Sequence, residues 1–175
     1  MNTQTNADLS IEKQARVLFK NYRRMKMEIL QLSESIDFLS KNIAQSVESD
    51  IYTASVSHGT GGFGGGSAND KLPKIAERVE KIRMEYDENM CLMKRKKSIF
   101  ERTVASIDIF ADSLEWSDRT IIRRRFIDED KKSLEEISNE IHLTVSAVKK
   151  RIVKLMLGYA ESAHFNISVV IEELK

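Results

Sequence analysis

The sequence predicts an all-α protein with long N-terminal helices and a C-terminal tri-helical helix-turn-helix domain. The chain of 175 residues contains one proline and 31% charged residues, a composition typical of long helices. Apolar residues recur every three or four positions over two long stretches. Polar side chains near the C-terminus stand where helix caps belong. We therefore expect a helical region over residues 1–113, the tri-helical domain over 114–158 and a tail over 159–175.

The first long stretch, residues 9–47, carries an uninterrupted apolar seam. The seam has heptad spacing and consists of Leu18, Tyr22, Met25, Ile29, Leu32, Ile36, Leu39 and Ile43. A single helix of this length would leave an apolar stripe in water, so it needs a partner. The pattern predicts a coiled coil.

The second long stretch, residues 71–113, repeats the pattern. Its apolar positions are Leu72, Ile75, Val79, Ile82, Tyr86, Met93, Phe100, Val104, Ile107 and Ala111. The two stretches can pair as an antiparallel hairpin within one chain or between chains of a homo-oligomer, and the sequence leaves both open. The connection is longer than the loops usual in helical hairpins, which keeps pairing between chains possible.

A glycine-rich loop at about residues 57–68 separates the two stretches. We interpret it as a flexible linker, because a run of glycines is costly to order. One alternative is a loop that orders around Phe63 on a partner. The other is a phosphate cradle, but the segment lacks the Lys-Ser/Thr pair of a P-loop and no strand precedes it.

The first helix of the C-terminal domain is expected to begin at Ser117, whose hydroxyl suits an N-cap. Trp116 and Ile121 would flank that cap as a hydrophobic staple. The helix would carry Ile122 and Phe126 on its apolar face and end at the acidic run 128–130.

The next two helices have clearer starts. Ser133 and Glu136 have the spacing of a capping box, in which each satisfies the other's backbone amide. After a tight turn, Thr144 caps the third helix, and Gly158 is expected to end it. The residues expected to face the other two helices are Val148, Ile152 and Leu155. This spacing predicts a helix-turn-helix.

The third helix would present a polar and cationic face to solvent. Small polar and cationic side chains in its first turns suit the major groove of DNA, and Thr144 at its N-terminus can contact a phosphate. The predicted DNA-binding residues are Arg123, Arg124, Thr144, Val145, Ser146, Lys149, Lys150 and Lys154, with Val153 also facing outward. The alternative is an ordinary three-helix bundle with a solvated basic face.

Composition argues against other classes of function. The net charge is +1, so positive charge is local, at residues 119–125 and 149–154. The single Cys91 fits a reducing compartment, and no apolar run approaches a membrane span, so we expect a cytoplasmic protein. No catalytic or metal-ligand spacing is present, so we expect neither an enzyme nor a cofactor. The tail is ambiguous between a short strand, a docking segment and a helix.

Residues 133–156 resemble region four, the promoter-reading domain, of bacterial sigma factors. The run LTVSAVKKRI at residues 143–152 is similar to the turn and recognition helix of extracytoplasmic-function sigma factors, and more loosely to LuxR-type domains. Two positions depart from the commonest pattern, because Ser138 replaces Ala or Gly and His142 replaces Gly. Histidine tolerates a left-handed turn position better than most residues.

The layout as a whole resembles small phage and prophage regulators, the late-gene activators of the ArpU and RinA kind. The resemblance implies a transcription activator that binds double-stranded DNA at a promoter, with host RNA polymerase as a further partner. Two alternatives remain. One is a phage small terminase subunit, which also combines a helix-turn-helix with helical oligomerisation. The other is a sigma-like module that binds polymerase without DNA.

Overall fold

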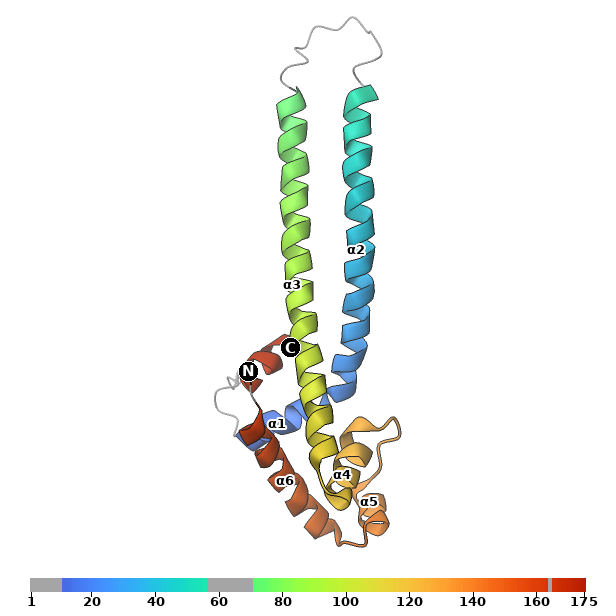
Figure 1. Cartoon of the computed structure of the whole chain (residues 1–175), viewed down its shortest axis with the longest axis vertical. Coiled ribbons are helices and arrows are strands. Elements are labelled where there is room, and N and C mark those ends of the chain that lie inside the picture. The colour runs from blue at the N-terminus through green and yellow to red at the C-terminus, as the bar shows by residue number, and fades with distance from the viewer. Residues whose placement is uncertain (1–10, 57–70, 164) are drawn as a thin grey trace, which may run out of the picture. The chain divides into compact units, whose positions relative to one another are not determined.

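The computed structural model describes residues 11–56, 71–163 and 165–175 (Figure 1). Its helices, in chain order, are α1 (Ile11–Lys20), α2 (Tyr22–Val56), α3 (Lys71–Ser113), α4 (Trp116–Ile122), the π-helical turn η3 (Arg123–Ile127), α5 (Leu134–Glu140), α6 (Val145–Ser162) and α7 (Ile167–Glu173). The predicted all-α class is confirmed. The predicted glycine-rich loop lies outside the described residues.

The internal contacts divide the chain into two units. Unit 1 comprises the described residues up to Ile29 together with Ser98–Lys175, and unit 2 is Leu30–Lys97. The boundary predicted between residues 113 and 114 falls inside unit 1. The N-terminal helix α1 and the last turns of α3 therefore belong to the same unit as the helix-turn-helix.

The core of unit 1 is built around α1. Ala15, Leu18 and Phe19 of this helix are fully buried. The ring of Phe19 makes edge-on contacts with three aromatic rings from other elements, which are Phe110 of α3, Phe126 of η3 and Tyr159 of α6. Such aromatic pairs contribute beyond the area they bury. One N-terminal side chain thus connects α3, η3 and α6.

The long first helix predicted over residues 9–47 is interrupted at Asn21. The Asn21 amide donates to the Val17 and Leu18 carbonyls, and its side-chain Nδ2 also donates to Val17 at 2.9 Å. Here α1 turns sharply away from the direction of α2 (Figure 1). The first seam residues, Leu18, Tyr22 and Met25, lie in the core of unit 1. Leu18 belongs to α1 and the other two to α2, so one continuous helix does not carry the predicted seam.

The predicted start of the first C-terminal helix is wrong. Helix α4 begins at Trp116, with Glu115 at the N-cap and no side-chain cap bond. Arg119 explains the earlier start, because its guanidinium donates to the Asp112 carbonyl in the last turn of α3 and to the Leu114 carbonyl just after it. The chain therefore turns directly after α3, before Ser117. Trp116 is 65% exposed and forms no buried staple.

The tail continues the fold of unit 1. Helix α6 runs past Gly158 to Ser162, so the predicted stop at this glycine is wrong. Burial explains the extension, because Tyr159, the residue after Gly158, is fully buried and contacts the rings of Phe19 and Phe110. The tail is helical, and α7 packs against α1 with Ile167, Val170 and Ile171 buried. The helix expected to continue through the tail is therefore interrupted between Ser162 and Ile167, and the separate helix α7 docks on α1, so the helical and docking readings each hold in part.

Unit 2 consists of the parts of α2 and α3 that lie side by side and antiparallel (Figure 1). The Ser40 hydroxyl approaches the Met90 sulfur at 3.9 Å across the pair. In this unit the described seam residues are only half-buried. They are Leu32, Ile36, Leu39, Val79, Ile82, Tyr86 and Met93. The side chains of the remaining predicted seam residues, Ile43, Leu72 and Ile75, lie outside the described residues. Within one chain, the hairpin arrangement is therefore the one observed.

Candidate nucleic-acid interface

The candidate interface begins with the capped helix α5. Ser133 Oγ accepts from the Glu136 amide at 3.2 Å, and the Glu136 carboxylate accepts from the Ser133 amide at 2.7 Å. This reciprocal pair is the predicted capping box, which is confirmed. The same bonds lower the pKa of Glu136 below its ordinary value, because they favour the ionised carboxylate.

The turn between α5 and α6 depends on His142. Its φ angle of 54° is left-handed, the conformation expected where glycine is usual in the sigma-like pattern. The Leu143 amide then bonds back to the Ser138 carbonyl at 3.0 Å. Thr144 follows as the N-cap of α6, and its hydroxyl accepts from the Ala147 amide at 3.2 Å, which confirms the predicted cap.

Helix α6 has the two predicted faces. Its buried face includes Val148, Ile152 and Leu155, as predicted, and also Met156 and Tyr159. Its solvent face consists of the exposed Ser146, Lys149, Lys150, Val153 and Lys154, with the half-buried Val145 at its edge. We call this set the α6 face.

The lysines of the α6 face have no acidic partner in the described ranges of the chain. Within the part of the chain that the structure describes, no hydrogen bond or ion pair engages Lys149, Lys150 or Lys154. Arg151, between them in sequence, behaves differently. It bonds the Ser117 hydroxyl at 2.8 Å and the Asp118 carboxylate at 2.9 Å, and so joins α6 to α4. Three cations of α6 therefore remain available to an external anion.

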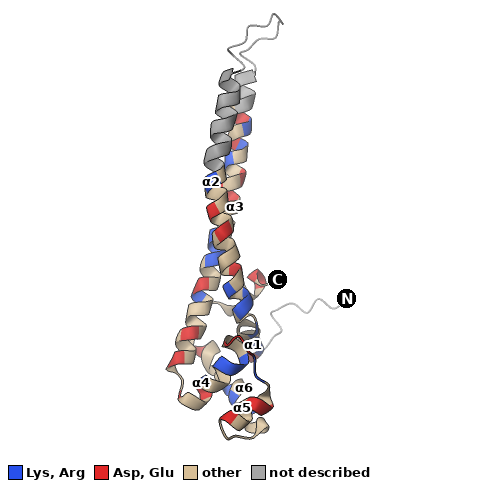
Figure 2. Cartoon of the chain, turned by 90° about the vertical axis from the view of Figure 1, so that its right-hand side faces the viewer, with Lys and Arg blue, Asp and Glu red and all other residues tan. Residues whose placement is uncertain are grey.

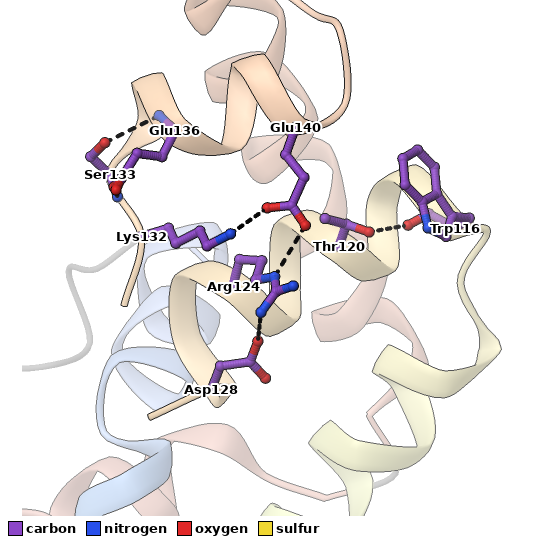
Figure 3. Close-up of polar contacts among 8 residues, drawn as sticks. All are labelled: Trp116, Thr120, Arg124, Asp128, Lys132, Ser133, Glu136 and Glu140. Atoms are coloured by element: carbon purple, nitrogen blue, oxygen red, sulfur yellow. Dashed lines mark hydrogen bonds and ion pairs between the residues drawn. The ribbon is translucent and has the colours of Figure 1, made fainter. Parts of the chain in front are cut away.

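The other two predicted DNA-binding residues, Arg123 and Arg124, already have acidic partners. Arg123 Nη2 lies 2.6 Å from the Asp112 carboxylate, and this bond raises the pKa of the guanidinium. Arg124 pairs with Asp128 and with Glu140, each at 3.2 Å (Figure 3). The structure therefore does not group these two arginines with the available lysines of α6.

Arg124 belongs to a small polar network that holds η3 against α5. Lys132 Nζ donates to the second oxygen of Glu140 at 2.7 Å (Figure 3). The Lys132 bond is the main cause that lowers the pKa of Glu140, and the Arg124 charge adds to it. The network fixes the position of α5, and through the turn that of α6. In this structure, the charge of Arg124 therefore serves to hold α5 and α6 in place.

A basic groove beside the α6 face was missed by the sequence analysis. It is a cavity of about 320 Å³ lined by Arg16 and Lys20 of α1, Arg125 and Phe126 of η3, Leu134 of α5, and Lys149, Ile152 and Val153 of α6. Figure 2 shows the Lys and Arg positions of α1 and α6 in this part of the molecule. The α1 cations are far from α6 in sequence, and locally they resemble any solvated helix face. Only the packing of α1 against α6 reveals that these cations lie beside the α6 face.

Comparison with known proteins adds no family to this geometry. No family model, curated protein or solved structure matches the chain. The described helices include none with the length and apolarity needed to cross a membrane. Among the described residues, no cluster of three or more His, Cys, Asp or Glu side chains is placed to hold a metal ion.

Proposed function

We propose that the protein is a sequence-specific DNA-binding transcriptional regulator that inserts α6 into the major groove. The observation that carries this proposal is the α6 face, where three lysines with no partner among the described residues lie beside a capped helix N-terminus. Arginine and lysine bond guanine edges, and serine bonds several bases. Ser146, Lys149 and Lys150 are therefore assigned to base contacts, with Val145 beside them.

Phosphate contacts are assigned to Thr144 and Lys154. Thr144 stands at the N-terminus of α6, where backbone amides and the helix dipole favour an anion. Lys154 is exposed one turn beyond Lys150 and has no partner among the described residues. Arg123 and Arg124 are omitted from this set, because each is paired with a carboxylate of the same chain.

The resemblance of residues 133–156 to sigma region four supports a promoter as the target. Together with the layout of the chain, it supports activation of phage or prophage late genes with host RNA polymerase, in the bacterial cytoplasm. Unit 2 is proposed to pair copies of the chain, because four large apolar residues there are more than half exposed, namely Leu30, Phe38, Met84 and Leu92. Sedimentation of the full chain would measure that association.

A binding experiment on selected DNA tests the proposal. The wild-type protein first selects duplexes from a random-sequence pool, and affinities are then measured for the selected duplex and for a shuffled one. Lys149→Ala is expected to reduce the difference between the two duplexes by about 1–3 kcal/mol, because it removes a base contact. Lys13→Ala, an exposed lysine of α1 outside the α6 face, is the matched control and should keep the wild-type difference.

Two outcomes would contradict the proposal. If the wild-type chain bound no duplex above background at low salt, DNA binding would be excluded. A sigma-like module that binds polymerase subunits alone would then be favoured. If the chain bound DNA but Lys149→Ala and Lys150→Ala left selectivity intact, the assignment of α6 as the reading helix would be wrong.

A further inference from the structure

We propose that the basic groove between α1 and α6 holds a phosphate strand of the bound duplex, so that α1 is part of the DNA interface. The inference rests on the proposed DNA binding and extends it to a second surface. Helix α1 lies outside the helix-turn-helix in sequence but belongs to the same unit. With α1 in contact, the protein would cover a longer stretch of the duplex than α6 alone would cover.

The groove combines cations from three elements. Arg16 and Lys20 come from α1, Arg125 from η3 and Lys149 from α6. Between these cations lie apolar side chains, of which Phe126 and Ile152 are nearly buried and Val153 is 40% exposed. The result is a cavity of about 320 Å³ with a cationic rim and an apolar floor.

The positive charge of the groove is only partly compensated. Arg16 is paired with Glu12 through two bonds of 2.8 and 2.6 Å. Arg125 donates to the Lys132 carbonyl at 2.9 Å, a neutral acceptor that leaves its charge in place. Lys20 and Lys149 engage no partner among the described residues. Like charges held together repel, and an anion bound between them relieves that repulsion.

Continuity with the α6 face favours a nucleic-acid strand as the occupant. Lys149 and Val153 belong to both surfaces, so a ligand that contacts the α6 face also reaches the groove. A recognition helix in the major groove is flanked by sugar-phosphate backbone, and cations beside it contact phosphates. The sugar carbons of that backbone suit the apolar floor.

The α1 cations are also held in place. On the core-facing side of the same helix, Ala15, Leu18 and Phe19 are fully buried, and Phe19 contacts Tyr159 of α6. Arg16 and Lys20 therefore project from a helix packed against α6. Side chains on an ordered helix lose less freedom on binding than those on a flexible arm.

The salt dependence of DNA binding tests the proposal with single-charge variants of the full chain. On the selected duplex, Lys20→Gln should reduce the slope of log affinity against log salt by about 0.9, the loss of one phosphate contact. It should weaken the shuffled duplex by the same factor and leave selectivity unchanged. Glu12→Gln, which releases Arg16, should change affinity and slope in the opposite direction.

The control is Lys13→Gln, which makes the same charge change on an exposed position of α1 that does not line the groove. It should keep the wild-type slope. Circular dichroism would establish that all three variants remain folded.

The outcomes separate this inference from the proposed function. If the wild-type chain binds selectively and Lys149→Ala relaxes selectivity, but Lys20→Gln and Glu12→Gln keep the wild-type slope, the groove is not a DNA contact and the proposed function stands. That result is expected if the groove instead takes an acidic peptide. Equal losses in Lys13→Gln and Lys20→Gln would also overturn the inference, because they would indicate net charge alone. If no duplex binds the wild type, both proposals fail.

Discussion

The ring of Phe19 in α1 meets the ring of Tyr159 in α6 edge-on, with 4.9 Å between the ring centroids. Both side chains are fully buried, and burial raises the pKa of Tyr159 to about 12. The pair joins α1 to the C-terminal half of α6. The helix-turn-helix of this protein is therefore stabilised by a segment from the other end of the chain.

Phe19→Ala should destabilise unit 1 severely. The substitution removes a fully buried ring with three aromatic neighbours, and such truncations cost about 3–5 kcal/mol. Chemical denaturation followed by circular dichroism would measure the loss. Ile109→Ala in α3 is the control, because Ile109 is 71% exposed and truncating it removes little buried surface. A loss below about 1 kcal/mol in Phe19→Ala would show that α1 is not part of the core.

Arg124→Ala should affect stability more than DNA binding. Its ion pairs with Asp128 and Glu140 are partly exposed, so the expected loss of unfolding free energy is at most about 1 kcal/mol. The salt slope of DNA binding should stay at the wild-type value, because this charge is already neutralised. Lys154→Ala is the comparison, and its slope should fall by about 0.9. Equal slope losses in the two variants would place Arg124 on the phosphate backbone after all.

His142→Gly should leave unit 1 as stable as the wild type or more stable. A non-glycine residue at φ 54° costs about 1–2 kcal/mol, and glycine avoids this cost but loses more entropy on folding, so the net gain is at most about 1 kcal/mol. His142→Ile should lose about 1–2 kcal/mol, because branching at Cβ strains this conformation. The His142 side chain is exposed, so neither change removes core packing. Thermal unfolding of both variants would show the order, and equal stability of the two would argue against a left-handed turn.

Glu140 should make stability depend on pH in the acid range. The Lys132 bond and the Arg124 charge lower its pKa below the ordinary value of 4.5, so folding favours the ionised form. This contribution is complete above the unfolded pKa and is lost as pH falls through the lower folded pKa. The unfolding free energy of Glu140→Gln should therefore fall less steeply than that of the wild type below about pH 4.5.

The control for this pH effect is Glu135→Gln, which changes an exposed carboxylate of the same helix with no partner among the described residues. It should keep the wild-type profile. A Glu140→Gln profile that matched the wild type would mean that the Arg124–Glu140–Lys132 network does not form in solution.

Sequence reasoning succeeded for helix starts and faces that depend on near neighbours. The capping box of Ser133 and Glu136 and the cap at Thr144 are bonds between residues three apart, and the structure confirms them. The N-cap predicted at Ser117 failed because bonds to residues farther along the chain decide the start of α4. Arg119 closes the end of α3, and Arg151 takes the Ser117 hydroxyl.

The same distinction applies to the candidate interface. The exposed lysines of α6 follow from helical periodicity, because a helix with Val148, Ile152 and Leu155 buried must turn Lys149 and Lys150 outward. Periodicity carries no information about partners elsewhere in the chain. The sequence prediction therefore included Arg124 among the available cations, although Arg124 pairs with Glu140. It also omitted Lys20, although Lys20 lines the same groove as Lys149.

By itself, the sequence determined the helical class, the capped helix pair and the cationic face of α6, because these depend on contacts within one turn of helix. Only the tertiary structure decided that α1 breaks at Asn21 and packs against α6. That arrangement depends on burying Phe19 among Phe110, Phe126 and Tyr159. Hydrophobic burial is non-directional and acts between residues far apart in the chain. A local pattern therefore does not specify which other apolar face a helix will pack against.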